Sequence, residues 1–517
     1  MSLARKGAFL ALAAFLISHG LALGLSPQDD AFISFRYARN ALEGQGLVFN
    51  PGERVEGYTN FLWTVMMIPM LASGAEPAQG ARALGLAAAL ALLVLLWRHE
   101  RRSPGAGAGW SGLAAGFLLF WSSSFVCEAV QGLETVFFAL LVTALILTTE
   151  REEEEGGPGL APGVLGALAA ITRPEGALVA LGAAAHRLLL APRGGGRGSL
   201  SGGRGRAALL TGGLPLAAAI LHRGLAWAYY GQPFPNTVYA KVGGTWDGVV
   251  RGAGYALQFA GAWWPVLLLA VAGLGACAAH RRSLWGVFVL GYVAYIIAVG
   301  GDYKSTFRFF VPVMPIVSLL AAAGAIAIAG WAFERRVPRA LTAASLLFGA
   351  ALGIFAWSGD ARDFAGVRTM RFETDRMAGR WLARSAPKDT VLATSNAGIL
   401  PYYSGLTTID MLGLTDAHIS HAQMPGMGRG MAGHEKGDGD YVLGRRPGIV
   451  LFMRPRITDT PVTLEDAGRQ MNFVAELQLW ENPAFHREYE WVSVPLSGWT
   501  FNYFRRRSGE GASSAPL

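Results

Sequence analysis

The sequence predicts an all-α polytopic transmembrane bundle of about eleven spans, followed by a small C-terminal α/β domain. Three observations support this fold class. Hydrophobic residues make up 52% of the 517 residues and charged residues only 15%, against the ~25% charged that is usual in soluble proteins. The apolar residues gather in runs of about 17–25, the length that crosses ~30 Å of hydrocarbon. After Trp357 the chain becomes more polar, and short strand-like segments replace the apolar runs.

The apolar segments define the expected spans. They lie at residues 7–25, 60–97, 108–127, 134–149, 160–172, 176–191, 207–229, 257–279, 284–299, 311–330 and 339–357. Segment 160–172 is short and fits a tilted, broken or re-entrant helix, whereas 60–97 fits either one kinked long helix or two spans. The first segment also fits a cleaved signal peptide ending near residues 22–24, but the many later spans favour a retained span.

The basic residues predict the orientation. The formal net charge of +8 is spread over short loops and forms no single stripe, which argues against nucleic-acid binding. Because Lys and Arg concentrate in cytoplasmic loops, we expect residues 5–6, 98–102, 186–206, 280–282 and 334–336 to be cytoplasmic. The protein would then be a multi-pass protein of the inner (cytoplasmic) membrane with its C-terminal domain extracytoplasmic. The alternative, in which 60–97 makes two spans, places 98–102 outside. Cys127 and Cys277 would fall at opposite faces, so we expect no disulfide, and no Cys/His cluster has metal-ligand spacing.

The predicted domains are a membrane module at residues 1–357, with its first outer loop at 26–59, and an extracytoplasmic α/β domain at 358–507. Residues 508–517 are rich in Gly and Ser and are expected to be disordered. Apolar spacing predicts a helix over residues 374–385. Alternation and β-branched residues predict strands at residues 391–394, 407–411, 448–453, 488–495 and 501–505.

The outer loops carry the polar residues that invite a functional interpretation. They lie at residues 29–60, 131–135, 172–175, 231–241 and 300–308. Carboxylates, Arg, Lys, Asn and Tyr stand there directly beside membrane ends, where charge is costly unless it is paired, hydrated or used. The outer face is therefore the expected working face.

Asp29 and Asp30 open a segment with amphipathic helical spacing, residues 29–40, which can lie in the membrane interface. Helix capping explains one Asp well, because a carboxylate at a helix start accepts backbone N–H bonds. Two adjacent carboxylates beside Arg36 also suit a general base whose pKa the neighbouring groups tune. The sequence favours Asp29 narrowly over Asp30 in this role.

A family resemblance rests on motifs that run in order along almost the whole chain. They are Asp29-Asp-Ala-Phe-Ile-Ser-Phe-Arg-Tyr-Ala-Arg-Asn40, Gly46-Leu-Val-Phe-Asn-Pro-Gly-Glu-Arg-Val-Glu-Gly-Tyr-Thr-Asn60, Gly132-Leu-Glu-Thr135, Arg173-Pro-Glu-Gly176, Gly301-Asp-Tyr303, Arg308-Phe-Phe310 and Ile409-Asp-Met-Leu-Gly-Leu-Thr-Asp416. The chain thereby resembles the GT-C membrane glycosyltransferases, and most nearly the mycobacterial terminal arabinofuranosyltransferases and their bacterial relatives. The resemblance implies an enzyme that takes sugar from a polyprenyl-phosphate donor at the outer leaflet, with Asp29 or Asp30 as base.

The implied chemistry calls for cations as well as a base, because the leaving group is a lipid phosphate. The candidates for binding the donor phosphate are Arg173, Lys241, Lys304 and Arg308. Each also fits a cation that reaches for the membrane interface. The candidates for substrate binding are Arg36, Glu56, Tyr58, Asn60, Glu134, Glu175, Asp302, Tyr303 and Asp410. Structural ion pairing and an interfacial tyrosine belt are the alternatives for these residues.

A second acidic pair, Asp438-Gly-Asp440, resembles the Asp-x-Asp metal site of nucleotide-sugar transferases, but it lies in a flexible loop. A lipid-phosphate donor does not require that metal, so no metal ligand is assigned, although a divalent cation stays open as an alternative. His418, His421 and His434 are expected to cover the mouth of the site rather than to bind an ion.

The expected function is therefore transfer of a sugar from a polyprenyl-phosphate donor to a cell-envelope glycan, lipid or protein acceptor. The expected partners are this donor, this acceptor and the lipid bilayer. One alternative is a transporter or flippase of lipid-linked sugars, which predicts broken helices and charges at mid-membrane. The other is a non-catalytic envelope scaffold, which leaves the charged outer loops unexplained.

Overall fold

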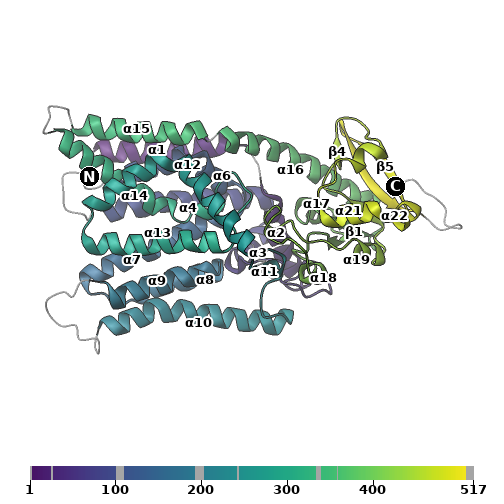
Figure 1. Ribbon diagram of the computed structural model, residues 1–517, viewed down its shortest axis with the longest axis horizontal. Coiled ribbons are helices and arrows are strands. Elements are labelled where there is room, and N and C mark those ends of the chain that lie inside the picture. The colour runs from purple at the N-terminus through teal and green to yellow at the C-terminus, as the bar shows by residue number, and fades with distance from the viewer. Residues whose placement is uncertain are drawn as a thin grey trace.

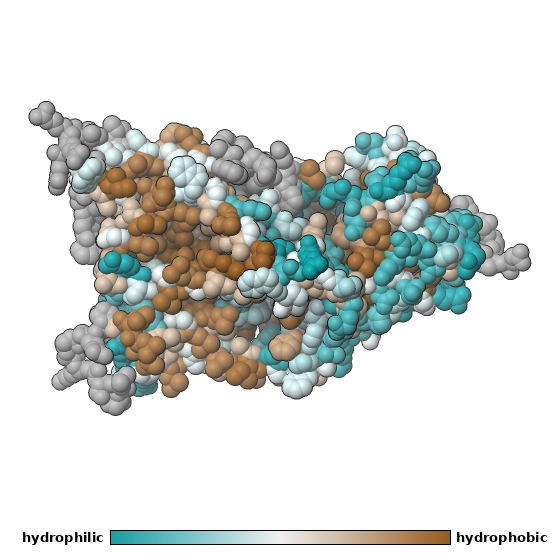
Figure 2. All heavy atoms as spheres, viewed as in Figure 1, coloured by the Kyte–Doolittle hydropathy of each residue, from teal (hydrophilic) through white to brown (hydrophobic). Residues whose placement is uncertain are grey.

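The computed structural model describes residues 3–24, 27–100, 110–191, 203–241, 244–333, 339–357 and 359–507, so the predicted tail at 508–517 lies outside the described residues. A helical bundle and a region with a small sheet follow one another along the long axis, with the C-terminus at the end of the sheet region (Figure 1). On the visible side, hydrophobic residues cover much of the bundle and hydrophilic residues cover most of the sheet region (Figure 2).

The bundle is built from helices that mostly run along the long axis (Figure 1). They are α1 (Leu3–Ala22), α3 (Phe61–Ala72), α4 (Pro77–Glu100), α5 (Ser111–Trp121), α6 (Ser123–Val130), α7 (Thr135–Glu155), α8 (Leu160–Thr172), α9 (Glu175–Leu189), α10 (Arg204–Tyr230), α12 (Trp246–Ala276), α13 (Ala279–Ala298), α14 (Met314–Phe333) and α15 (Arg339–Trp357). α12 packs against α13, α14 and α15, and α10 packs against α8 and α9. Glycines permit close approaches: a Cβ on Gly273 of α12 would lie 1.9 Å from the backbone oxygen of Leu320 in α14.

The long apolar helices make this a multi-pass membrane protein. By length and composition, four helices in the described part of the chain can each cross a membrane, and a fifth span results if α5 and α6 count as one. The remaining apolar helices are shorter or more polar, so the count of about eleven spans stays a prediction, as does the side of the membrane that each loop occupies.

Two predicted segments are broken in the structure. Segment 60–97 divides at residues 73–76 into the short helix α3 and the long helix α4. The segment predicted as a span at 108–127 divides into α5 and α6, which meet at a bend of 76°. That these two helices form one span stays a prediction. The bend falls at Ser122, whose side chain accepts the backbone N–H of Phe125 and so caps α6. The expectation that 160–172 is short agrees with α8.

The helix predicted from Asp29 forms as α2 (Asp29–Leu42), but it does not lie at a lipid interface. Nine of its 14 residues are buried, including Arg36, which is 1% exposed. Phe32 and Phe35 pack with Trp63 of α3 and with Phe372 of the sheet region. The interfacial expectation is therefore wrong, because the polar face of α2 finds protein partners.

The C-terminal region contains a six-stranded mixed sheet. Its strands are β1 (Val391–Thr394), β2 (Thr407–Asp410), β3 (Ile449–Leu451), β4 (Ile457–Thr458), β5 (Tyr489–Leu496) and β6 (Trp499–Arg506). The order is β2-β1-β3-β6-β4, with β5 also paired to β6; β1, β2 and β3 are parallel and the β6 pairings are antiparallel. The predicted strands correspond to all of these except β4, whose two residues are too few for an alternation to be recognised.

Helices surround this sheet and connect it to the bundle. They are α16 (Gly359–Ser385), α17 (Ile399–Ser404), α18 (Ala417–His421), α19 (Gly439–Gly444), α20 (Leu464–Gly468), α21 (Val474–Glu481) and α22 (Pro483–Glu488). Val450 and Ala393 face one apolar core, whereas Ile449 and Leu392 face the other, as period-two alternation requires. α16 begins just after α15 and runs on toward the sheet (Figure 1), so the predicted helix at 374–385 is only its second half. The predicted domain boundaries stay predictions.

Candidate functional site

A cavity of about 1060 Å³ lies where the bundle, α2 and the C-terminal region meet. The short helix α11 (Asn236–Lys241) and the segment 299–309, which ends in the 3₁₀ helix η1 (Arg308–Phe310), form part of its wall. Most of the predicted site residues line it: Asp29, Asp30, Tyr58, Asn60, Glu134, Arg173, Glu175, Lys241, Asp302, Tyr303, Arg308 and Asp410. Arg36, Glu56 and Lys304 are predicted site residues that do not line it.

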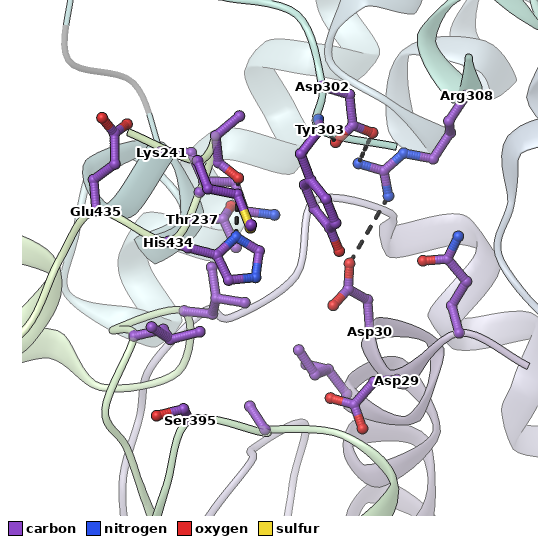
Figure 3. Close-up of a pocket in the computed structure, with 18 of the residues that line it drawn as sticks. Asp29, Asp30, Thr237, Lys241, Asp302, Tyr303, Arg308, Ser395, His434 and Glu435 are labelled. Atoms are coloured by element: carbon purple, nitrogen blue, oxygen red, sulfur yellow. Dashed lines mark hydrogen bonds and ion pairs between the residues drawn. The ribbon is translucent and has the colours of Figure 1, made fainter. Parts of the chain in front are cut away.

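Asp30 faces two cations from the segment between α13 and α14. Its Oδ2 lies 3.3 Å from Lys304 Nζ and 3.9 Å from Arg308 Nη1, and Arg308 Nη2 lies 2.9 Å from Asp302 Oδ2. Figure 3 shows Asp30 and Asp302 on two sides of the Arg308 guanidinium. Burial alone would raise the pKa of Asp30, but Lys304, Lys241 and Arg308 hold that pKa well below its usual range. Asp30 is thus a stable carboxylate, 32% exposed.

Lys304 is fully buried behind the cavity wall, where it also donates to the side chain of Gln28. Burial and the like charge of Arg308 together lower the pKa of Lys304 to about 8, against the opposing effects of Asp30 and Asp302. Lys304 therefore carries its charge at neutral pH and loses it in mildly alkaline solution.

Asp29 contacts the C-terminal region instead. The backbone N–H of Ile399 donates to its Oδ1 over 2.8 Å, and that of Gly398 donates to its Oδ2 over 3.0 Å. A Cβ on Gly398 would lie 1.9 Å from the backbone oxygen of Asp29, so this close approach requires glycine. Burial, with the neighbouring charges of Asp375 and Asp30, raises the pKa of Asp29 to about 7, against the lowering effect of the Ile399 N–H. Asp29 both lines the cavity and holds the start of α17.

Glu134, Arg173 and Glu175 form a closed ion-pair group. Arg173 donates to Glu134 over 3.0 Å and to Glu175 over 2.6 Å, and Asn60 donates to Glu134 over 2.7 Å. Tyr292 of α13 also donates to Glu175 over 3.3 Å. Because one guanidinium serves two carboxylates, the group carries no spare positive charge. These contacts favour the structural-pairing alternative for Arg173 over phosphate binding.

Arg36 and Glu56 are used in structural contacts away from the cavity. Arg36 donates to the carbonyl oxygens of Phe49, Pro401 and Leu406 over 2.7–2.9 Å, which ties α2 to its own loop and to the C-terminal region. Glu56 forms an ion pair with Arg223 of α10. The geometry therefore does not favour substrate binding by either residue. The resemblance motif contains both residues because they shape the first outer loop.

Other candidates divide between the cavity and its surroundings. Asp410 lines the cavity, but its carboxylate accepts the backbone N–H groups of Leu412 and Thr415 over 3.0 and 2.8 Å. Burial, despite these two N–H bonds, raises the pKa of Asp410 to about 6. Tyr303 lines the cavity with its ring 4.9 Å from that of His434, and Tyr58 contacts the Tyr230 hydroxyl at 3.1 Å.

Of the three histidines expected at the mouth, His434 lines the cavity, whereas His418 and His421 do not. His418 lies 2.8 Å from Asp438 Oδ2 instead. Asp438 also caps α19, and Asp440 accepts a hydrogen bond from Asn482, so the resemblance of this pair to a metal site reflects helix capping.

Sequence reasoning missed several residues of the site. Gln28 donates to Gln131 beside Lys304, and Glu128 accepts from Thr306 over 2.7 Å within the segment that carries Lys304 and Arg308. Glu128 is fully buried at the end of an apolar segment. A carboxylate at the end of an apolar segment is costly unless it is paired or used, so Glu128 could have been recognised from the sequence as a candidate site residue. Arg371 and Arg454 also line the cavity and lay outside the loops that the sequence singled out.

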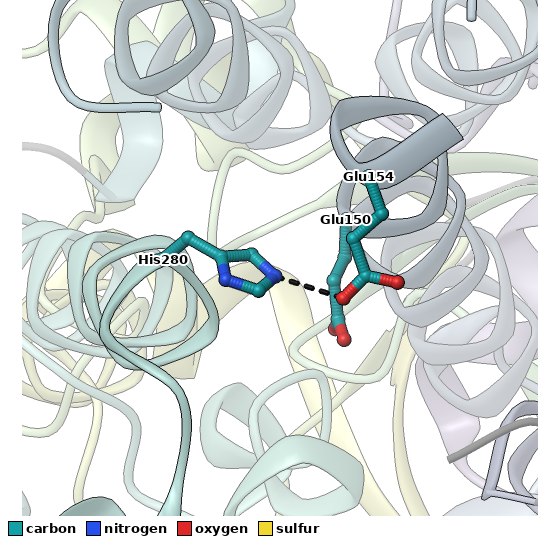
Figure 4. A group of neighbouring side chains, drawn as sticks. All are labelled: Glu150, Glu154 and His280. Carbon is teal, nitrogen blue, oxygen red and sulfur yellow. Dashed lines mark hydrogen bonds and ion pairs between the residues drawn. The ribbon is translucent and has the colours of Figure 1, made fainter. Parts of the chain in front are cut away.

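One group elsewhere has the geometry of a metal site, among the residues that the structure describes. Oxygen and nitrogen atoms of Glu150, Glu154 and His280 lie within 4.8 Å of one another (Figure 4). Arg281 donates to Glu150 over 2.6 Å, however, and Trp285 donates to its other oxygen over 2.9 Å. Both oxygens of the buried ligand are thus already used, one of them by a cation.

Comparisons with known proteins agree with the resemblance. Residues 365–507 match a family model described as a domain of unknown function, DUF8728. The terminal β-(1→2)-arabinofuranosyltransferase of Mycobacterium tuberculosis is 30% identical over 376 residues, which cover 64% of this chain and 57% of that protein. The chain thus spans little more than half the length of this curated relative.

Two solved structures share the fold across both chains. Crystal structures of ArnT from Cupriavidus metallidurans, in the apo state and bound to undecaprenyl phosphate, align with TM-scores of 0.61 and 0.60 at 12% identity. The alignments cover 97% and 98% of this chain and 98% of ArnT. The chain therefore has the fold of ArnT, and the predicted resemblance to the mycobacterial terminal arabinofuranosyltransferases is confirmed.

Proposed function

We propose that this protein is a membrane glycosyltransferase that moves a sugar from a polyprenyl-phosphate donor to a cell-envelope acceptor at the outer face of the inner membrane. The observation that carries the proposal is the position of Asp30, a partly exposed carboxylate in a large cavity, next to Lys304 and Arg308. The similarity to an arabinofuranosyltransferase and the undecaprenyl phosphate bound to ArnT support this donor class.

The proposed reaction uses the two charge types together. An acceptor hydroxyl attacks the anomeric carbon of the donor, the bond from that carbon to the phosphate oxygen breaks, and Asp30 takes the hydroxyl proton. The polyprenyl phosphate leaves as an anion, stabilised by Lys304, Arg308 and Lys241. The acceptor gains the sugar, so atoms and charges balance.

Asp30 is the better candidate for the base on contacts, although the sequence favours Asp29. Both oxygens of Asp29 already accept backbone N–H bonds, whereas the contacts of Asp30 are with cations that a phosphate can share. When the donor phosphate binds Lys304 and Arg308, their stabilisation of the Asp30 carboxylate weakens and its pKa rises. A base tuned in this way gains strength only when the donor is bound.

The test is a transfer assay with the full-length protein in phosphatidylcholine nanodiscs. Radiolabelled polyprenyl-phosphate arabinose and other polyprenyl-phosphate sugars are offered with extracted envelope glycans and lipids. We expect donor-dependent labelling that falls about 10³-fold in Asp30→Asn, within the range for loss of a general base. Glu465→Gln, which changes an exposed surface pair, serves as the control.

The outcomes separate the assignments. If none of the donors labels an acceptor, the transferase proposal is refuted. Donor-dependent labelling at the wild-type rate in Asp30→Asn, combined with loss in Asp29→Asn, moves the base to Asp29.

A further inference from the structure

A second cationic group on the cavity wall comes from the C-terminal region. Arg371 of α16 and Arg454 and Arg456 of the β3–β4 connection all line the cavity. Residues 371 and 375 are four positions apart, so they share one face of α16. We call the three arginines at positions 371, 454 and 456 the arginine rim.

Among the residues that the structure describes, one arginine of the rim is held in an ion pair and two are not. Arg456 is buried and donates to both oxygens of Asp375 over 2.8 and 2.7 Å, so this pair is closed. Arg371 and Arg454 are exposed, and in the described part of the chain no ion pair or side-chain hydrogen bond of either is found. Partial burial lowers the pKa of Arg371, and the like charges of Arg456 and Arg454 lower it further.

This arrangement differs from the cations around Asp30. There, the charges of Lys304 and Arg308 are met by Asp30 and Asp302. At the rim, Arg371 and Arg454 have no such ion pair among the described residues, and the like charges of Arg454 and Arg456 act on Arg371. An anion that binds there would relieve this repulsion. Guanidinium groups match the geometry of phosphate, carboxylate and sulfate, with which they form bidentate hydrogen bonds.

The position of the rim favours a soluble or extended ligand over the bilayer surface. Arg371 stands twelve residues beyond the start of α16 at Gly359, or about 18 Å along a helix. α16 leaves the bundle roughly along its long axis (Figure 1). The headgroup layer extends only about 5–8 Å beyond the hydrocarbon. A membrane span that ends at Trp357, as the sequence predicts, would therefore place Arg371 beyond the headgroups.

We propose that the arginine rim binds an anionic group of the acceptor, so that the acceptor is a glycan or glycolipid bearing phosphate, carboxylate or sulfate. That the bound molecule is an acceptor rests on the proposed transferase function, whereas anion binding by the rim does not depend on that function. The rim would hold the acceptor at one end of the cavity while the donor phosphate occupies the cations next to Asp30 at the other.

Binding is tested without turnover, by isothermal titration of the full-length protein in phosphatidylcholine nanodiscs. The probes are a sulfated heparin disaccharide and its desulfated counterpart. We expect the sulfated form alone to bind, and binding to weaken with salt. The double variant Arg371→Gln/Arg454→Gln should weaken binding of the sulfated disaccharide about tenfold or more. The double variant Arg371→Lys/Arg454→Lys should retain part of the affinity. Arg384→Gln, an exposed arginine of the same helix off the cavity wall, is the matched control.

Several results would overturn the proposal. Equal binding of both disaccharides, or wild-type affinity in the folded double variant, would show that the rim recognises no anion. Equal loss in Arg384→Gln would indicate diffuse charge attraction. Competition by undecaprenyl phosphate would assign the rim to the donor phosphate, and loss of binding in nanodiscs with phosphatidylglycerol would assign it to lipid headgroups. Rim binding intact in a protein with no transfer activity would refute the transferase and leave the anion site standing.

Discussion

The two ends of the helical bundle both carry charged residues, but they use them differently. At the end away from the sheet, α7 closes with a run of carboxylates that meet partners from neighbouring helices. Arg281, Arg187, His186 and His280 contact Glu150, Glu152, Glu153 and Glu154, respectively, over 2.6–3.0 Å. At the other end, Asp30, Asp302 and Arg308 line a cavity of about 1060 Å³, and Lys304 is buried behind its wall.

This difference separates charge that builds the fold from charge that is available to a ligand. Each carboxylate at the α7 end faces a protein partner, so a ligand would have to break a pair there. In the proposed reaction, Lys304 and Arg308 could bind a phosphate in place of part of their interaction with Asp30. No buried charge would then lack a partner of opposite charge. The combination of a cavity and charges that a ligand could share, rather than charge alone, therefore distinguishes the end at which we propose the active site.

The largest effect is expected from exchanging one cation at each end. Lys304→Met should lower kcat/KM for donor transfer about 10²–10³-fold, since removing one preorganised stabilising group at developing charge has that effect. Arg281→Met should keep kcat/KM per folded molecule within about twofold of the wild type, because the ion pair between Arg281 and Glu150 lies at the end of the bundle away from the cavity. Transfer assays on both purified variants check this. A similar loss in both would erase the functional difference between the two ends.

The next effect is on stability and runs the opposite way. Glu150→Gln should lower the free energy of unfolding by about 2 kcal/mol, because Arg281 loses its ion-pair partner while the Trp285 N–H keeps an acceptor. Thermal melting in nanodiscs, with transfer assayed in parallel, measures both quantities. Unchanged melting would show that the α7 pairs are not structural, and lost transfer would make that end functional.

Local features of the sequence were sufficient to predict the broad fold and part of the site. Apolar length predicted the long helices, and alternation predicted β1, β3 and β5. The Asp pair correctly began a helix at Asp29, because carboxylates favour helix starts. Nearly all predicted outer-loop candidates share one cavity wall, since loops from one face of a bundle converge.

The sequence could not predict which residues far apart along the chain contact one another. Asp29 meets Ile399, 370 positions away, and only this contact shows that its oxygens are occupied. The burial of Arg36 likewise depends on carbonyls of residues 401 and 406. The break at Ser122 depends on a serine cap inside an otherwise apolar run, which hydropathy averages out. Arg371 and Arg454 come together only when α16 and the β3–β4 connection pack.

The pH dependence of transfer sharpens the contrast between Asp30 and Asp29. A carboxylate base works when deprotonated, so activity falls as pH drops through its pKa. With Asp30 as base, kcat/KM should hold down to about pH 5 because the cations keep its pKa low. With Asp29 as base, kcat/KM should fall about tenfold per unit below pH 7, from its raised pKa. The acid limb of kcat should lie at higher pH than that of kcat/KM. Bound donor phosphate weakens the interaction of the cations with Asp30 and so raises the pKa of Asp30 in the complex.

The alkaline side of the same profile reports Lys304. Its charge is lost as pH rises through about 8, so kcat/KM should decline there. The decline should be absent in Lys304→Met, whose activity is low at every pH. A profile that stays flat to high pH in the wild type would separate Lys304 from phosphate binding.

The smallest effect is expected from removing divalent metal at the α7 end. EDTA should change the free energy of unfolding by less than about 0.5 kcal/mol, because Arg281 and Trp285 already occupy both oxygens of Glu150. A metal ion there would have to displace a guanidinium from a buried carboxylate, which leaves the arginine charge without its partner. Zn²⁺ titration followed by thermal melting checks this, with Glu154→Gln as the comparison. A rise in melting temperature that Zn²⁺ produces in the wild type and not in Glu154→Gln would make this end a ligand site and break the contrast between the two ends.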